Sequence, residues 1–330
     1  MELDDSASPA SQDWASLLEH VFARCEGAYA DVTLRGYRRD LETFASWCEE
    51  RGETFMPSTP RIVGAFIDNQ VRSYSYATIK RRVAAIQFLH RLSDLPSPVS
   101  SSDVYLALRR AGRTKGRRPK QVRGLTNDLL EEILAACPDT LSGLRDAALI
   151  SVGYDTLCRS AELARMDVSH VDLQSQTVYI PRAKNDPFGD GRIAGLSERS
   201  TDLVSRWLKG ARLREGALFR GLHTAKIGAG HLETSSIRRL VKVAANRAGL
   251  TDAAADLSGH SMRVGGAQDL MTAGNDTLLI MTAGGWKNVE VVARYVEKAA
   301  VLLRQREASS IRQAGGNLSL SNYRKFRNLL

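Results

Sequence analysis

Seven residues of this chain have side chains suited to chemistry on a phosphodiester, and they occur in the order Arg159, Glu162, Lys184, His260, Arg263, Trp286 and Tyr295. Two guanidinium groups can bind the non-bridging oxygens of a phosphate with forked, permanently charged donors. A tyrosine hydroxyl can attack phosphorus and form an ester, which conserves the bond energy for rejoining. The set therefore indicates breakage and rejoining of a DNA strand with neither metal nor cofactor.

Each of these residues also has an ordinary structural interpretation. Arg159 and Glu162 are three positions apart, which is the usual spacing of a surface ion pair on a helix. Lys184 can be a plain turn lysine, and a histidine three residues before an arginine is common by chance. Tyr295 can be a core residue of an amphipathic helix. Only the whole set, in this order, favours catalysis.

The elements that must position this set are mostly helical. The pattern predicts a helix from about residue 127 through Leu134 and a buried apolar helix over Arg145–Cys158. Alternating runs at Thr177–Arg182 and Arg192–Leu196 predict a hairpin with a long turn that contains Lys184. From Glu198 onward the pattern predicts helices again. We therefore expect a catalytic domain over residues 124–312 that is mainly helical and has a small antiparallel sheet.

The N-terminal third predicts a second, all-helical domain over residues 14–108, preceded by an acidic disordered tail at residues 1–13. Apolar residues recur at helical spacing in Thr33–Cys48 and Tyr76–Leu92, and basic residues occupy most of the other positions. The basic faces can bind DNA or can simply be solvated. In Tyr76–Leu92 the pattern places Arg81 and Arg82 on the outer face.

Residues 109–123 contain no acidic residue and two glycines among many arginines and lysines. Such a segment cannot bury enough apolar surface to pack by itself, so it predicts a basic linker between the two domains. The linker, with Arg117 and Arg118, can lie along a phosphate backbone or can serve only for solubility. Residues 313–330 are expected to form a separate C-terminal tail.

Net charge points to a polyanionic partner. The 330 residues carry a formal charge of +9 and a pI near 9.5, and neutralising phosphates releases condensed counterions. Nucleic acid is the first candidate and an anionic membrane surface the second. The acidic N-terminus is unlike a signal peptide, and no apolar run is long enough to span a bilayer, which predicts a cytoplasmic, nucleoid-associated protein. The four scattered cysteines and the histidine spacing predict no zinc site.

The joint pattern resembles the tyrosine site-specific recombinases of the phage integrase family. The resemblance is densest in Ser258–Gly274 and Ala283–Tyr295, and it continues more weakly in Tyr154–Arg165 and in the segment from Thr78 to Pro98. Many members have histidine at the position of Trp286, so the tryptophan indicates a narrower group within the family. The resemblance implies a helical core-binding bundle followed by a mainly helical catalytic domain.

The resemblance also implies a role for each residue of the set. Tyr295 would attack phosphorus and form a 3′-phosphotyrosine, while Arg159 and Arg263 bind the phosphate. His260 and the indole N–H of Trp286 would add hydrogen bonds to the same phosphate. Lys184 would protonate the leaving 5′-oxygen as general acid, and Glu162 would orient the residues around Arg159 without reacting.

For binding, we expect contacts to the major groove or flanking phosphates from Thr33, Arg35, Arg38, Lys80, Arg81 and Gln87. The resemblance implies inverted half-sites in double-stranded DNA, each site bound by a homodimer, and two sites paired in a homotetramer that exchanges strands through a Holliday junction. The helix that follows Tyr295, with Ala299–Leu303, would dock on a neighbouring protomer. Two alternatives are a type IB topoisomerase that relaxes supercoils and a non-catalytic DNA-binding regulator of the same fold.

Overall fold

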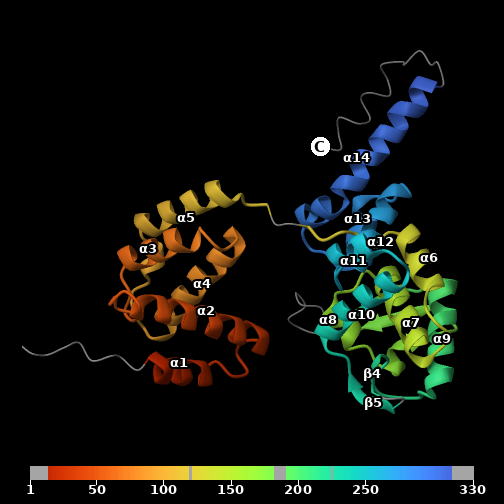
Figure 1. Cartoon of the computed structure of the whole chain (residues 1–330), viewed down its shortest axis with the longest axis horizontal. Coiled ribbons are helices and arrows are strands. Elements are labelled where there is room, and N and C mark those ends of the chain that lie inside the picture. The colour runs from red at the N-terminus through yellow and green to blue at the C-terminus, as the bar shows by residue number, and fades with distance from the viewer. Residues whose placement is uncertain (1–13, 119–120, 182–190, 224–225, 314–330) are drawn as a thin grey trace, which may run out of the picture. The chain divides into compact units, whose positions relative to one another are not determined.

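The computed structural model describes residues 14–118, 121–181, 191–223 and 226–313 (Figure 1). It divides into two compact units, with the boundary between Lys120 and Gln121. Both units are mainly helical, and the described strands all belong to the C-terminal unit, which confirms the predicted fold class. The tail predicted at residues 1–13 lies outside the described residues, as do Lys184 and all but the first residue of the tail predicted at residues 313–330.

The N-terminal unit consists of five α-helices and one short 3-10 helix in its described part. They are α1 (Trp14–Ala23), α2 (Asp31–Glu49), α3 (Pro60–Gln70), α4 (Tyr76–Leu92), η1 (Pro98–Ser100) and α5 (Ser102–Lys115). Three of these helices begin at side-chain caps, because Thr59, Ser75 and Ser101 each accept a hydrogen bond from a backbone N–H of the first turn. The predicted helices at Thr33–Cys48 and Tyr76–Leu92 are therefore present as α2 and α4.

A cluster of aromatic rings forms much of the core of this unit. The ring of Phe44 on α2 lies 4.9 Å from that of Phe66 on α3, and Trp47 stacks on Phe44 and contacts Phe66 edge-on. One prediction for α4 was wrong, because Arg82 is buried with only 7% of its surface exposed. Its position is explained by the polar groups around it, which are the Asp40 carboxylate, the Gln70 amide and the face of Tyr74.

The first part of the basic stretch at residues 109–123 is helical and does not form a linker. Residues 109–115 form the last turns of α5, which packs through Val104, Ala107 and Ala111 and therefore carries its arginines on the opposite face. The helix ends at Gly116, whose φ of 72° is a conformation that glycine adopts readily. The first seven residues of the predicted linker are therefore helical.

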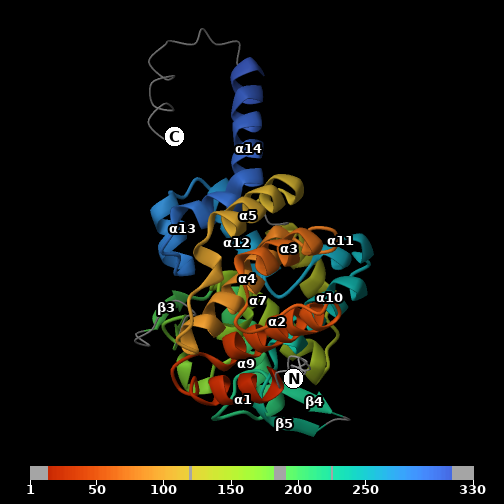
Figure 2. The same cartoon turned by 90° about the vertical axis from the view of Figure 1, so that its left-hand side faces the viewer.

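The described part of the C-terminal unit contains nine α-helices and one 3-10 helix. They are α6 (Asn127–Ala135), α7 (Leu141–Asp155), α8 (Ser160–Ala164), η2 (Val168–His170), α9 (Glu198–Ala211), α10 (Thr234–Arg247), α11 (Thr251–Asp256), α12 (Ser261–Thr272), α13 (Thr277–Gly284) and α14 (Val289–Gln313). Helix α7 is the central one, since ten of its residues are buried and it packs against α9 and α12. Figures 1 and 2 show α14 at one end of this unit.

Two small antiparallel sheets complete the C-terminal unit. Strands β1 (Val171–Asp172), β2 (Thr177–Ile180) and β3 (Arg192–Gly195) form the first, with Tyr179 opposite Ile193, and this is the predicted hairpin. Strands β4 (Arg220–His223) and β5 (Lys226–His231) form the second, at the end of the unit opposite α14 (Figures 1 and 2). Helices were expected from Glu198 onward, with a break near residues 228–231, and the two strands found here were not predicted, because β5 is glycine-rich and gives no alternating apolar signal.

The helix predicted over Arg145–Cys158 ends earlier, at Asp155. Leu157 has a φ of 50°, which is incompatible with continuing a right-handed helix. The Thr156 carbonyl instead accepts a hydrogen bond of 2.7 Å from Arg192. This break turns the chain into the segment that carries Arg159.

Candidate active site

Four separate segments of the C-terminal unit bring the predicted residues together. Arg159 is the residue that precedes α8, and His260 and Arg263 lie at the start of α12. Trp286 follows α13, and Tyr295 lies within α14. Because α12 packs against α7, α13 and α14, its first turn is where these segments meet. Lys184 belongs to residues 182–190, which lie outside the described part of the chain.

The hydroxyl of Tyr295 lies in hydrogen-bond contact with a histidine. The distance from the hydroxyl oxygen to Nε2 of His260 is 2.8 Å, and the two rings are 5.4 Å apart with an edge-on arrangement. Burial, together with the positive charges of the nearby Arg263 and Arg159 guanidinium groups, lowers the pKa of His260 to about 4. The imidazole is therefore neutral near pH 7, and its Nε2 can accept the phenolic proton.

The hydrogen bond expected from His260 to the phosphate stays a prediction, and the structure adds a contact between His260 and the nucleophile candidate. The ring of Trp286 lies 5.7 Å from that of Tyr295 and is 7% exposed. The phenol ring therefore lies close both to an imidazole that can accept its proton and to an indole ring.

Arg263 is fully buried, and only some of its N–H donors have hydrogen-bond partners. One of its terminal nitrogens donates to the Leu157 carbonyl, and its guanidinium carbon lies 3.9 Å from the centre of the Trp286 ring. Its Nε and the other terminal nitrogen have no hydrogen-bond partner among the described residues. Burial, together with the positive charge of Arg159, lowers the pKa of Arg263 to about 10. Unpaired buried donors of this kind favour an anionic ligand, because an unsatisfied buried charge is costly.

Arg159 is held by Glu162. One carboxylate oxygen of Glu162 accepts from the Arg159 guanidinium at 2.7 Å, and the other accepts from the Arg159 backbone N–H at 2.9 Å. Glu162 is 3% exposed, whereas 23% of the Arg159 side chain is exposed. The carboxylate therefore fixes both the main chain and the side chain of Arg159, which is the contact expected of an orienting residue.

No role was predicted for Arg192, although this residue connects two segments of the site. Its guanidinium donates to the Ala283 carbonyl and to the Thr156 carbonyl, both at 2.7 Å. Burial lowers its pKa. Arg192 thereby connects the segment that precedes Trp286 with the segment that precedes Arg159. The only signal in the sequence is that an arginine opens the second strand of the predicted hairpin.

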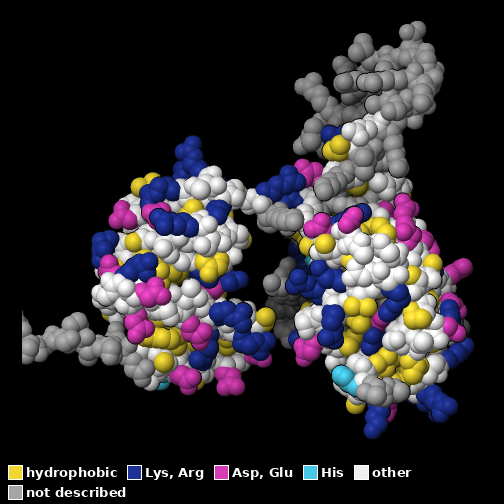
Figure 3. All heavy atoms as spheres, viewed as in Figure 1, with side chains coloured by type: hydrophobic (Ala, Val, Ile, Leu, Met, Phe, Trp, Pro, Cys, Tyr) yellow, Lys and Arg dark blue, Asp and Glu magenta, His cyan; other side chains and the backbone are white. Residues whose placement is uncertain are grey.

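The residues expected to contact DNA from the N-terminal unit all lie on its surface or near it. Arg35, Lys80, Arg81 and Gln87 are exposed, and Thr33 and Arg38 are half-buried. Figure 3 shows Lys and Arg side chains spread over both units, with acidic side chains among them. Lys80 and Arg117 also line an open hollow together with Tyr76 and Tyr105. Arg118 is exposed.

Arg81 is held in place by a buried carboxylate. Its Nε and one terminal nitrogen donate to the two oxygens of Asp40 at 2.6 and 2.8 Å, and this pairing raises the pKa of Arg81. The Asp40 side chain is 1% exposed, whereas 54% of the Arg81 side chain is exposed. A bidentate pair fixes the guanidinium plane, so Arg81 presents its remaining N–H groups in one orientation.

Two family models match this chain. Residues 123–301, more than half of its length, match the phage integrase family, and residues 17–93 match the N-terminal SAM-like domain of phage integrases. The chain belongs to the phage integrase family. It is thus a site-specific tyrosine recombinase, an enzyme that transfers DNA strands. The set of residues recognised in the sequence was therefore a correct guide to the family.

Relatives within the phage integrase family extend over most of the chain. Recombinase cre of Escherichia phage P1 is 29% identical over 292 residues, which cover 82% of this chain and 84% of that protein. The integrase/recombinase xerD homolog of Selenomonas ruminantium is 28% identical over 294 residues, with 84% and 85% covered. The similarity therefore includes both units.

Solved structures of recombinases share the fold. A post-cleavage complex of XerH site-specific recombinase bound to palindromic difH substrate has a TM-score of 0.63 at 18% identity, covering 91% of this chain and 84% of that chain. A lambda integrase dimer bound to a COC′ core site has a TM-score of 0.58 at 15% identity, covering 86% and 76%. At these identities the likeness shows the fold alone.

Two features missing from the described residues concern other classes of function. Among them, no group of three His, Cys, Asp or Glu side chains is arranged to hold a metal ion. None of the described helices combines the length and the apolar character needed to cross a membrane.

Proposed function

We propose that this recombinase cleaves one DNA strand by attack of Tyr295 on phosphorus, giving a 3′-phosphotyrosine and a free 5′-hydroxyl. The observation that supports this most is the 2.8 Å contact between the Tyr295 hydroxyl and Nε2 of His260 beside the unsatisfied donors of Arg263. The new P–O bond to tyrosine replaces the bond to the 5′-oxygen, so the energy for rejoining is retained.

In this mechanism, binding of the phosphate makes His260 a stronger base toward the Tyr295 hydroxyl. The pKa of His260 is low because of burial and because Arg263 and Arg159 are positively charged. A bound phosphate neutralises the field of the two arginines and raises the pKa of His260. His260 thus becomes a better acceptor for the phenolic proton only when DNA is in place, which limits hydrolytic side reactions.

The other residues stabilise charge and complete the proton transfers. The buried N–H donors of Arg263 and the exposed part of Arg159 bind the non-bridging oxygens, whose charge grows in the transition state. Glu162 holds the guanidinium of Arg159, and the ring of Trp286 packs against that of Arg263. Lys184 provides the proton for the leaving 5′-oxygen, which completes the exchange without a metal or a nucleotide cofactor.

For recognition, we propose that Thr33, Arg35, Arg38, Lys80, Arg81 and Gln87 contact DNA from the N-terminal unit and that Arg117 and Arg118 contact the backbone. The enzyme acts as a Cre-like recombinase in the cytoplasm, on nucleoid DNA. It binds inverted half-sites as a homodimer, pairs two sites as a homotetramer and resolves a Holliday junction. The DNA-bound recombinases that share the fold support this scheme.

Capture of DNA under denaturing conditions tests the proposal. The wild-type protein and Tyr295→Phe are incubated with a library of fragments from around the gene, and DNA that stays attached is sequenced. We expect an adduct with wild type alone, at a site with inverted repeats. Equal binding without an adduct from either protein would favour the non-catalytic regulator. Relaxation of supercoiled DNA carrying one site, without exchange between two sites, would favour a topoisomerase.

A further inference from the structure

The backbone carbonyl of Tyr295 accepts hydrogen bonds from two side-chain amides. Nε2 of Gln268 lies 3.0 Å from this carbonyl oxygen, and Nε2 of Gln121 lies 3.2 Å from it. All three residues are partly buried, so water competes weakly for these contacts. A carbonyl oxygen has two lone pairs, and here side chains from two distant segments converge on one oxygen.

Gln268 belongs to the helix that also positions the catalytic groups. His260 immediately precedes α12, Arg263 lies in its first turn, and Gln268 lies further along it. Residues of α12 and its cap therefore contact Tyr295 at two points. His260 contacts the phenol hydroxyl, and Gln268 contacts the backbone carbonyl. Together the two contacts fix the position of Tyr295 relative to α12.

Gln121 lies in a different structural context, at the first residue of the C-terminal unit. It opens the segment of residues 121–127, named here the lead-in segment, which connects the basic stretch to α6. The backbone N–H of Leu125 donates to the Ser261 carbonyl at 2.8 Å. A β-carbon added at Gly265 of α12 would collide with the Leu125 carbonyl, so the lead-in segment and α12 pack backbone against backbone.

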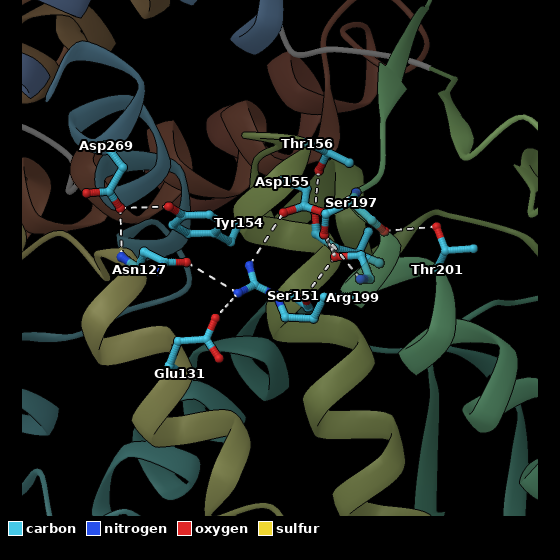
Figure 4. A network of polar contacts seen from close by, with 12 residues as sticks. Asn127, Glu131, Ser151, Tyr154, Asp155, Thr156, Ser197, Arg199, Thr201 and Asp269 are labelled. Carbon is cyan, nitrogen blue, oxygen red and sulfur yellow. Dashed lines mark hydrogen bonds and ion pairs between the residues drawn. The ribbon is translucent and has the colours of Figure 1, made fainter. Parts of the chain in front are cut away.

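The far end of the lead-in segment is also fixed to α12. The Asn127 N–H donates to the Asp269 carboxylate at 2.7 Å, and the same oxygen accepts from the Tyr154 hydroxyl at 2.7 Å (Figure 4). Asp269 directly follows Gln268, so the segment is anchored close to the amide that holds Tyr295. A displacement of the lead-in segment therefore acts on α12 and on Tyr295 together.

We propose that Gln121 and Gln268 are positioning residues that hold the main chain of Tyr295 so that its hydroxyl stays on His260. This inference rests on the proposed role of Tyr295.

Gln→Met variants test the inference, because methionine keeps the length of the side chain and removes the amide donor. Gln121→Met, Gln268→Met and the double variant are compared with Gln174→Met, which changes an exposed turn residue. The readouts are the rate of covalent adduct formation at saturating DNA and the affinity for DNA. We expect each single variant to lose about 2- to 10-fold in rate, the value of one neutral hydrogen bond. The double variant should lose at least the product of the two.

A second pair of variants separates positioning from general stability. Gln268→Glu places an acceptor against the carbonyl and should be slower than Gln268→Met, whereas Gln268→Lys keeps a donor and should recover much of the rate. Affinity for DNA should stay within about twofold throughout, since only attack geometry changes. Equal rates for wild type and the double variant, or a loss confined to affinity, would overturn the inference.

The outcomes also distinguish the two proposals. If wild type forms no adduct, or if Tyr295→Phe forms the same one, the proposed function fails. If the adduct depends on Tyr295 but its rate is unchanged without the two amides, only the positioning role fails.

Discussion

Two buried arginines, one in each unit, show how the same side chain serves different purposes. Arg82 and Arg263 each place the guanidinium carbon 3.9 Å from the centre of an aromatic ring, Tyr74 and Trp286 respectively. Arg82 also lies 3.6 Å from the buried Asp40 carboxylate and donates to Gln70. In the described part of the chain, Arg263 forms no ion pair and donates only to the Leu157 carbonyl.

The difference lies in where the compensating negative charge comes from. In the N-terminal unit, Asp40 supplies it for the cluster of Arg81 and Arg82, although the Nε of Arg82, 3.6 Å from that carboxylate, has no hydrogen-bond partner among the described residues. In the C-terminal unit, both oxygens of Glu162 are engaged by Arg159, and Arg263 keeps unpaired donors. A buried cation without a partner is destabilising unless an external anion binds, so the second cluster is suited to a phosphate.

Removal of the internal counterion should have the largest effect. Asp40→Asn leaves Arg82 buried without a charge partner and should lower the free energy of unfolding of the N-terminal unit by about 3–5 kcal/mol. Hydrogen exchange of the amides in α2 and α4 measures this loss separately from the other unit. Glu49→Gln, at an exposed position of the same helix, is the control. A loss below about 1 kcal/mol would mean that the cluster is effectively solvated.

Loss of the second arginine should affect catalysis without an equal loss of stability. Arg263→Met removes a preorganised donor to the phosphate and should reduce the rate of adduct formation about 100- to 1,000-fold. Because it also removes an unpaired buried charge, the free energy of unfolding should not fall by more than about 1 kcal/mol. Thermal and denaturant unfolding beside single-turnover cleavage measure both effects. A large destabilisation would show that Arg263 is paired within the protein after all.

The pH dependence of cleavage should show that the active-site arginines lower the pKa of His260. Because the pKa of His260 is lowered to about 4, kcat/KM should stay flat as the pH falls from about 8 to about 5. An unperturbed histidine would lose its acceptor form near pH 6.5. In Arg263→Met, one positive charge is gone, so the acid limb of the remaining activity should move to higher pH. A wild-type limb near pH 6.5 would contradict the burial of His260.

The smallest effect, on DNA affinity, is expected at Arg81, because its guanidinium is already paired with the Asp40 carboxylate. Arg81→Gln should weaken DNA binding and reduce the slope of log affinity against log salt by about 0.9, the value of one phosphate contact. Charge reversal at this position would also set a carboxylate beside the buried Asp40 and disturb the fold, so the neutral variant is the cleaner test. An unchanged salt slope would remove Arg81 from the interface.

Much of the secondary structure could be predicted because local patterns dominate it. Helix α4 has the predicted ends, since Ser75 caps it and its apolar positions follow the helical period. The β2–β3 hairpin follows from two alternating runs. Strands β4 and β5 were missed, because glycine-rich, half-exposed strands depend on pairing with each other and carry little local signal.

The polar contacts were harder to predict. Arg82 was assigned to the outer face of α4, since sequence shows its charge but not the carboxylate that Asp40 brings from α2. The same holds for Arg192, whose two carbonyl partners come from distant segments. Periodicity places a residue on a face of a helix, but the partner that makes burial of a charge tolerable belongs to another element.

The sequence by itself determined the chemical set, its order and the two mainly helical domains, because residue type fixes which groups can bind phosphate or attack it. Only the tertiary structure decided how those groups are tuned. The contact of His260 with Tyr295, the low pKa of that histidine and the unpaired donors of Arg263 arise from burial and from charges brought together by folding. Protonation and pairing depend on distances in space, which residue order does not contain.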